Sequence, residues 1–343
     1  MNFTNKTLFH STIICTALLA HGSASAQSKP IELRFAHWVP ATHILVKSAL
    51  EPWAKSVETA SKGSIKVVLY PAQQLGKAVD HYDMARTGVA DLAWVSPGYQ
   101  PGRFPIFSVA DIPMLINNGV GGSQAVDAWY RGYADKEMKD IHFCLAHVHI
   151  GSIHSRKPVR SPADLKGLKV RPSSGAVAQT MTVLGATNVQ LSAVDARDAI
   201  DRGLADMLTF PWSALVNFGI DKATKFHIDM PFNTGNFVWA MNKRWYSSLD
   251  ASQKAVIDSH CSNEWALKAG GDYAKAEDAG REQLLKNQGH TFTKLEASEI
   301  DAWKKAVEPV VKAWAQDAQK AGENPDEVLS KLKQELSRRN SLY

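Results

Sequence analysis

AVDARDAIDRGLADMLTFPW, residues 193–212, repeats a pattern that the chain already carries in AVDHYDMARTGVADLAWVSP, residues 78–97. Each segment begins with Ala-Val-Asp, has a second aspartate three residues after the first, and places a glycine ten residues from its start. We expect an amphipathic helix that ends at this glycine, a residue favoured in left-handed helix caps. A short apolar strand should follow, at 92–95 and at 207–210, and should stop at a proline turn. The repeated unit therefore predicts two related lobes.

Segments typical of strands and helices alternate around the two repeats. Strands are expected at 31–38, 64–71 and 165–171, and helices at 42–61 and 174–186. This alternation predicts an α/β fold with mostly parallel sheets. The 317 residues after the first 26 of the 343 are also close to the size limit of a single core, which again favours two lobes.

Two further segments are expected to cross between the lobes. Residues 139–155 form either a strand pair or one long strand, and residues 236–249 have the pattern of a strand that returns. Two crossings predict a hinge and a cleft between the lobes. After Asp250 we expect a nearly all-helical region, because apolar residues recur at helical spacing: Ile300, Trp303, Val307, Val310 and Trp314.

Residues 1–26 have the features of a secretory signal peptide. An apolar run follows Lys6, and the small residues at 24–26 precede the expected cleavage before Gln27. Cys15 lies inside the apolar run and not at the cleavage site, so a lipid anchor is not expected. No later stretch reaches the roughly 18 apolar residues that a membrane-spanning helix needs. We therefore expect a soluble exported protein.

Composition and motifs argue against several classes of protein. The net charge is +5, and basic and acidic residues are interspersed, which gives no support for nucleic-acid binding. The chain has no G-x-S-x-G, P-loop, H-E-x-x-H or C-x-x-C motif and no G-x-G-x-x-G after a strand, so we expect neither an enzyme nor a cofactor. Cys144 and Cys261 remain after removal of the signal peptide, and their pairing is left open.

The segment IHFCLAHVHIGSIH, residues 141–154, contains four histidines. On a strand, His147 and His149 would share one face. With a third ligand from elsewhere in the chain they could bind a metal ion. The alternative is that at least one histidine lines the cleft and offers a hydrogen bond. We expect no metal site and keep His149 as a cleft residue.

Arg171 ends the expected strand in LKGLKVRPSSG, residues 165–175. Ligands of open α/β sheets lie beyond the carboxyl ends of the strands. An arginine in that place can hold a carboxylate through two parallel hydrogen bonds. The alternative is a surface arginine paired with an acid such as Asp164. The corresponding strand ends of the two repeats, 94–96 and 210–212, are expected to face the same cleft, which favours the carboxylate site.

Several motifs occur in an order that resembles the DctP-type solute-binding proteins of TRAP (tripartite ATP-independent periplasmic) transporters. The motifs are LRFAHWVPATH, VVLYPAQQLG, GVADLAWVSP, SPADLKGLKVRPSSG, LGATNVQLSAVDA and GLADMLTFPW. The resemblance runs from about Ile31 to about Asp326. It implies an α/β, two-lobed periplasmic-binding-protein fold with a ligand cleft between the lobes and a helical C-terminal region.

The resemblance also implies how the chain is divided and what it does. Lobe I would comprise 27–150 with a return segment near 238–275, and lobe II would comprise 151–237 with C-terminal helices near 276–343. The family captures an organic acid in the periplasm and delivers it to a sodium-driven TRAP permease without ATP hydrolysis. We expect a monomer that binds a small-molecule carboxylate.

In the family, the arginine of the KVR segment binds the ligand carboxylate, and Arg171 matches it. Three positions depart from known patterns. Gly151 lies nearest to a second arginine of many members, Phe210 replaces an asparagine of sialic-acid-binding members, and Ser96 replaces a carboxylate. A more aromatic and less charged pocket argues against sialic acid and favours a smaller monocarboxylate. The predicted ligand-binding residues are Arg171, Trp94, Ser96, Phe210, Trp212, His37, Trp38 and His149.

Two other functions stay open at this point. A secreted enzyme on the same scaffold would turn over the bound acid, although no catalytic motif supports it. A ligand-sensing protein for a membrane receptor would use the same pocket, and the sequence does not separate that function from transport.

Overall fold

One sheet of nine strands runs through the molecule. The computed structural model describes Met1 and residues 29–343, so the predicted signal peptide lies outside the described residues except for Met1. The strands are β1 (Ile31–Ala36), β2 (Ile65–Tyr70), β3 (Leu92–Val95), β4 (His142–Ser155), β5 (Lys169–Arg171), β6 (Thr187–Asn188), β7 (Met207–Phe210), β8 (Phe226–Met241) and β9 (Thr291–Thr293). Their order is β2-β1-β3-β8-β4-β7-β5-β6, and β9 pairs with β8.

The sheet consists of two parallel groups joined by two long strands. In the first half, β1 pairs in parallel with β2 and β3, and in the second half β5 pairs in parallel with β6 and β7. Between them β4 and β8 are antiparallel, from His142 opposite Met241 to Ser155 opposite Phe226. β8 adjoins β3 and β4 adjoins β7, so both long strands pass from one half to the other. The expected parallel pairing is confirmed within each half, and the junction is antiparallel.

The sequence repeat forms the same structural unit twice. In the first half, α2 (His81–Thr87) ends at Gly88 and is followed by β3. In the second half, α6 (Ala196–Asp201) is followed by Gly203 and β7. Both glycines have a left-handed backbone, with φ of 86° and 67°, which a residue without Cβ adopts without strain. The predicted helix–glycine–strand order is therefore confirmed in both places.

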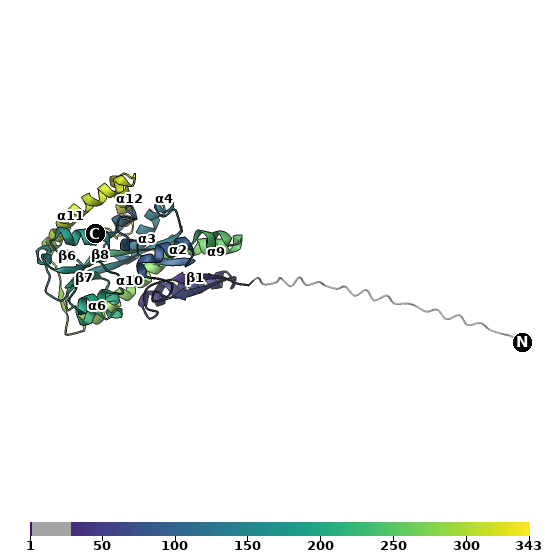
Figure 1. Ribbon diagram of the computed structural model, residues 1–343, viewed down its shortest axis with the longest axis horizontal. Helices are drawn as coiled ribbons and strands as arrows, with labels where there is room; N and C mark the ends of the chain where they lie inside the picture. The colour runs from purple at the N-terminus through teal and green to yellow at the C-terminus, as the bar shows by residue number, and fades with distance from the viewer. Residues whose placement is uncertain (2–28) are drawn as a thin grey trace.

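Helices lie on both sides of the sheet, with α11 (Ala297–Lys320) and α12 (Pro325–Arg338) above it and α6 below it in Figure 1. The other α-helices are α1 (Glu51–Ala60), α3 (Gly119–Tyr130), α4 (Ala134–Glu137), α5 (Gly175–Val183), α7 (Trp212–Asn217), α8 (Lys243–Ser248), α9 (Ala251–His260) and α10 (Asn263–Leu285). Within residues 29–343, no helix is long and apolar enough to cross a membrane.

The C-terminal helices pack on different parts of the core. On α11, Trp303 is buried with residues of the second half, whereas Val310 and Trp314 are buried with residues of the first half. The apolar face of α12 packs on the core of the first half, where α12 contacts α3. The spacing that predicted a helix here is thus explained by burial, because residues three and four apart share a face. The exact lobe boundaries stay a prediction.

Two expectations about secondary structure were wrong in detail. The returning strand ends at Met241 and begins at Phe226, ten residues before the expected start. Asn242 stops it, because its side-chain oxygen accepts a hydrogen bond from the backbone nitrogen of Trp245 at 2.9 Å and caps α8. The strand expected at 165–171 is confined to Lys169–Arg171, because Pro162–Leu165 forms a short helical turn. The region after Asp250 is nearly all helical as expected, with β9 as a short edge strand beside β8. Of the two alternatives for 139–155, the single long strand is correct.

A disulfide joins Cys144 of β4 to Cys261, the residue after α9. The two cysteines are 117 residues apart in sequence. The bond therefore ties a central strand to the start of the C-terminal helical region. This answers the question that the sequence left open.

Candidate functional site

A cavity of about 50 Å³ lies where the strands of both halves end. Its wall comes from the last residues of β3, β5 and β7, from the segments that follow β1, β3, β5, β6 and β7, from the middle of β4 and β8, and from α10. The lining residues are Trp38, Val39, His43, Trp94, Ser96, Tyr99, His149, Gly151, Arg171, Ser173, Ala193, Thr209, Phe210, Pro211, Ala214, Phe218, Asn233, Gly235, Phe237 and Tyr273. This is the place that the strand-end argument predicts for a ligand.

Six of the eight predicted ligand-binding residues line this one cavity, and two do not. The six are Arg171, Trp94, Ser96, Phe210, Trp38 and His149. Trp212 begins α7, stacks on Phe292 with ring centroids 5.4 Å apart, and lines a separate cavity beside Glu277. The side chain of His37 is fully buried outside the lining, and burial lowers its pKa to about 4.

Arg171 is the only cation in the lining of this cavity, and its side chain is 1% exposed. Its Nε donates a hydrogen bond to the carbonyl oxygen of Leu191 at 3.1 Å, and Nη2 donates to the hydroxyl of Tyr99 at 3.2 Å. Among the described residues no carboxylate forms an ion pair with it. Burial of a charge without a counter-ion costs free energy, so a bound anion would stabilise this guanidinium.

The alternative reading of Arg171 as the partner of Asp164 is wrong. The Asp164 carboxylate accepts hydrogen bonds from the backbone nitrogens of Arg160 and Ser161 at 3.0 and 2.7 Å. It caps the short helical turn at Pro162–Leu165, and these hydrogen bonds hold the pKa of Asp164 below its usual value. This aspartate is exposed, whereas Arg171 is buried.

Aromatic rings form much of the cavity wall. Trp38 stacks on Trp94 with centroids 4.4 Å apart, and Trp94 stacks in turn on Phe237 at 4.4 Å. On the side of the second half, the Phe210 ring lies 5.7 Å from the Arg171 guanidinium carbon. Flat apolar walls next to a cation suit a ligand with an aromatic ring and a negative charge.

Several buried polar atoms of the lining have no hydrogen-bond partner among the described residues. They are Trp38 Nε1, His149 Nε2, Thr209 Oγ1 and Asn233 Oδ1. Buried polar groups are almost always paired in folded proteins. Unpaired donors and acceptors gathered around one cavity therefore indicate a place where a bound molecule or water completes the hydrogen bonding.

Burial disfavours the charged form of the two central histidines, His147 and His149. His149 stacks on Tyr273 with centroids 3.5 Å apart, and burial lowers its pKa well below the ordinary value. His147 lies outside the lining, accepts a hydrogen bond from Trp94 Nε1 at 3.0 Å, and has a pKa lowered to about 3 by burial. Within residues 29–343, no group of three potential ligands is placed to hold a metal ion. The positive charge of the cavity therefore comes from Arg171.

Gly151 lacks a side chain for a clear steric reason. A Cβ at this position would lie 2.6 Å from Oδ1 of Asn233, which is closer than real Cβ contacts. Asn233 also donates a hydrogen bond from Nδ2 to the hydroxyl of Ser173 at 2.8 Å. An asparagine from β8 thus occupies the space that a larger residue at 151 would need.

Sequence reasoning missed the other fourteen residues of the lining. Four of them are Tyr99, Asn233, Phe237 and Tyr273, and Tyr273 comes from the middle of α10. A signal existed for Tyr99, which lies two residues after the proline that ends the first repeat. The other three depend on how β8 and α10 pack, and no local motif marks them.

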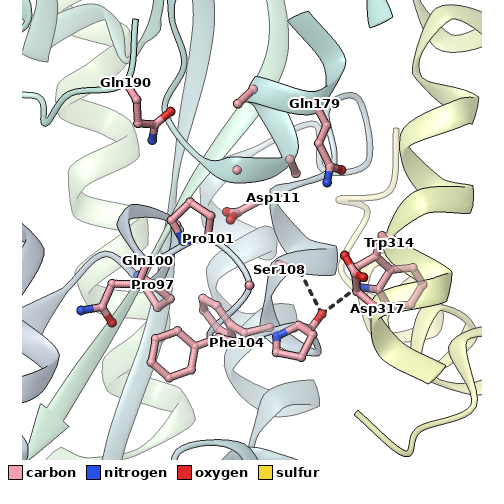
Figure 2. Close-up of a pocket in the computed structure, with 17 residues that line it drawn as sticks. Pro97, Gln100, Pro101, Phe104, Ser108, Asp111, Gln179, Gln190, Trp314 and Asp317 are labelled. Carbon is pink, nitrogen blue, oxygen red and sulfur yellow. Dashed lines mark hydrogen bonds between the residues drawn. The ribbon is translucent and has the colours of Figure 1, made fainter. Parts of the chain in front are cut away.

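A larger cavity of about 220 Å³ lies nearby, and Figure 2 shows Asp111 at its centre with Pro101, Gln179 and Asp317 around it. Its lining contains two carboxylates and no lysine or arginine. Burial raises the pKa of Asp111 to about 7, and its Oδ1 accepts a hydrogen bond from Asn236 at 2.5 Å. An anion would find no counter-charge here, so the smaller cavity is the better candidate site.

Several known proteins are similar to this chain in sequence and fold. The chain is 30% identical to a TRAP solute-binding protein from an unidentified marine microbe, specific for aromatic acid ligands and solved with 3-hydroxybenzoate. The match covers 91% of this chain and all of that one, with a TM-score of 0.87. A TRAP solute-binding protein from Rhodoferax ferrireducens, solved with copurified benzoate, is 28% identical, with a TM-score of 0.86 and coverage of 90% and 98%.

A curated solute-binding protein from Albidiferax ferrireducens is 27% identical over 180 residues, which is 50% of this chain and 52% of the relative. The chain thus matches about half the length of that relative. The model of the family of bacterial extracellular solute-binding proteins, family 7 (DctP), matches residues 35–317. With its two-lobed α/β fold, the chain belongs to this family, whose members are solute-binding proteins and not enzymes.

Proposed function

We propose that this protein binds a small aromatic monocarboxylate in the cavity beside Arg171. The observation that carries the proposal is a buried guanidinium without an ion-pair partner, next to stacked aromatic rings. An Arg–carboxylate pair with two parallel hydrogen bonds would supply the missing counter-charge. Similar proteins of known structure hold benzoate and 3-hydroxybenzoate, which agrees with this ligand class.

The lining residues take different parts in the proposed site. Arg171 anchors the carboxylate, and Trp38, Trp94 and Phe210 contact the ring of the ligand. Ser96 and His149 are proposed as polar contacts, because both are buried in the wall and His149 Nε2 has no protein partner. His37 and Trp212 are assigned no ligand contact, since neither lines the cavity.

Binding is proposed to close the two lobes, with boundaries near those expected from the sequence. The cavity wall comes from both halves of the sheet, so a ligand inside it contacts both. A ligand can shift an open–closed equilibrium only through contacts that it makes better in one state. The ring contacts of the first half and the Arg171 contact of the second half together meet this condition.

We further propose that the mature protein, residues 27–343, works as a periplasmic monomer and delivers its ligand to a sodium-driven TRAP permease. Family membership and the TRAP proteins of similar fold support this proposal. Proteoliposomes that contain a TRAP permease from the same organism test it. Uptake of labelled ligand should require this protein and a sodium gradient and should not require ATP. Uptake without the protein, or without sodium, would contradict the proposal.

The ligand class is tested by thermal unfolding with a panel of small molecules. Benzoate, 3-hydroxybenzoate, succinate and a neutral sugar would each be added to the purified mature protein. A ligand at 100 times its Kd stabilises the folded state by about 2.7 kcal/mol, which gives a measurable rise in Tm. We expect the aromatic monocarboxylates to raise Tm most. A rise with the sugar alone would overturn the proposal.

A further inference from the structure

Tyr99 belongs to the first half of the molecule, yet its hydroxyl contacts the second half. It ends the short helical turn Pro97–Tyr99, which follows β3. Its hydroxyl oxygen accepts a hydrogen bond from the backbone nitrogen of Ala193 at 3.0 Å and another from Nη2 of Arg171 at 3.2 Å. Both donors lie more than 70 residues further along the chain. One hydroxyl therefore links the two halves at the wall of the cavity.

The hydrogen atom of this hydroxyl has to find a different partner. A phenol has one O–H donor besides its acceptor lone pairs. Ala193 N–H and the Arg171 guanidinium can only donate, so neither can accept the Tyr99 proton. An acceptor next to Arg171 would complete the arrangement. A carboxylate bound to Arg171 brings two oxygens that only accept.

We propose that Tyr99 is a ligand-contacting residue that donates its O–H to the carboxylate held by Arg171 and so fastens the closed lobes over the ligand. This inference rests on the proposed function and adds a second carboxylate donor from the opposite lobe. The two hydrogen bonds that the Tyr99 oxygen accepts polarise its O–H group and make it a stronger donor. Arg171 and Tyr99 would then bind one carboxylate from the two sides of the cleft.

The neighbours of Tyr99 show that the two halves meet closely at this point. A Cβ on Gly98 would lie 2.7 Å from Cβ of Ser174, and a Cβ on Gly175 would lie 3.4 Å from Pro101. The Tyr99 hydroxyl reaches Ala193 and Arg171 because these segments touch. Separation of the lobes would break its hydrogen bonds to both residues.

Tyr99→Phe tests the proposal because it removes one oxygen and keeps the ring that lies near Trp38 and Arg171. Benzoate binding to the mature protein would be followed by calorimetry and by stopped-flow fluorescence. We expect an affinity loss of about 10- to 100-fold, in line with the loss of a hydrogen bond to a charged group. The loss should lie in a faster dissociation rate, with the association rate changed by less than threefold, since the hydroxyl acts after closure.

Tyr246→Phe is the matched control, because its hydroxyl bonds to Asp258 on an exposed surface away from the cavity. It should bind benzoate as the unchanged protein does. The Tm of ligand-free Tyr99→Phe should stay within a few degrees of the unchanged protein, which separates a binding role from a structural one. Tyr99→Phe with unchanged benzoate affinity would overturn the inference alone. Absence of carboxylate binding to the unchanged protein would overturn the proposed function.

Discussion

Ala36 and Arg171 occupy equivalent positions in the two halves of the sheet. Ala36 pairs with Ala93 of the first repeat, and Arg171 pairs with Leu208 at the matching position of the second repeat. One strand end therefore carries a methyl group and the other a guanidinium. The duplicated framework thus forms an asymmetric cavity, in which the second half supplies the charge.

Phe210 is expected to select for an aromatic ring in the ligand. The variant Phe210→Leu keeps an apolar wall but removes the ring that lies 5.7 Å from the Arg171 guanidinium carbon. Loss of aromatic and cation–π contacts should weaken benzoate binding by about three- to tenfold. Calorimetry with benzoate and with an aliphatic acid of similar size checks this. An equal loss of affinity for both acids would show that Phe210 does not distinguish an aromatic from an aliphatic ligand.

Gly98 is expected to be needed for closure of the lobes. In Gly98→Ala, the new Cβ would lie 2.7 Å from Cβ of Ser174, and overpacking of this kind costs about 1–3 kcal/mol. Because the shortest contact, at 2.7 Å, arises where the two halves meet, ligand affinity should fall about tenfold or more while Tm without ligand changes little.

The double variant Gly98→Ala/Ser174→Gly is the matched control for this contact. It removes the Ser174 Cβ that the new methyl group would meet. Glycine replaces serine at the start of α5 at a cost of a few tenths of a kcal/mol. The second change should restore most of the affinity. A double variant that binds as weakly as Gly98→Ala would mean that the contact with Ser174 does not govern binding.

The disulfide is expected to stabilise the fold without affecting the ligand. Cys144 and Cys261 close a segment of 117 residues, and neither lines the cavity. Replacement of both by alanine should lower the free energy of unfolding by ~2–5 kcal/mol, as expected for a long closed loop. Urea unfolding with and without reductant measures the effect. An unfolding curve of the unchanged protein that does not respond to reduction of the bond would contradict this prediction.

Buried neutral histidines should make the protein less stable in mild acid. Burial lowers the pKa of His147 to about 3 in the folded state, whereas an unfolded histidine titrates near 6.5. As the pH falls from about 6.5 to about 4, the unfolded chain takes up a proton at His147 that the folded chain does not. Each such histidine lowers the free energy of unfolding by up to ~1.4 kcal/mol per pH unit in this window.

His147→Gln removes one titrating side chain, so the contribution of His147 to the pH dependence can be measured alone. Glutamine can still accept the hydrogen bond from Trp94. Urea unfolding at pH 7, 6 and 5 should give a shallower dependence on pH for the variant by about one proton. Asp111 and Glu277, whose pKa values burial raises to about 7, act in the opposite direction but are unchanged between the two proteins. Equal slopes for the two proteins would show that His147 is protonated in the folded state.

The sequence predicted the framework because its signals are local. Glycine caps and proline turns marked the two repeats, and the position of Arg171 at the end of a strand marked it as a candidate ligand-binding residue. The face of a side chain was harder to assign. Successive residues of an extended segment point to opposite faces, so Trp38 lines the cavity while His37 does not. After Pro211 the chain turns into α7, which carries Trp212 away from the cavity wall.

The remaining contacts depend on packing between distant segments. Tyr273 reaches the cavity from α10, and Asn233 reaches it from the middle of β8. No motif or regular spacing in the sequence indicates that Tyr273 or Asn233 lies near Arg171. The disulfide is another example, since it joins β4 to a residue that follows α9 and is 117 positions away in the sequence.

The central claim, that Arg171 anchors a carboxylate, is tested most directly by calorimetry of benzoate binding to Arg171→Ala. Arg202→Ala, which removes an exposed arginine outside the cavity, is the control and should bind as the unchanged protein does. Loss of a buried charge pair should cost ~2–5 kcal/mol, so the affinity of Arg171→Ala should fall by about 30-fold to several-thousand-fold. Benzoate affinity within threefold of the unchanged protein would contradict the claim.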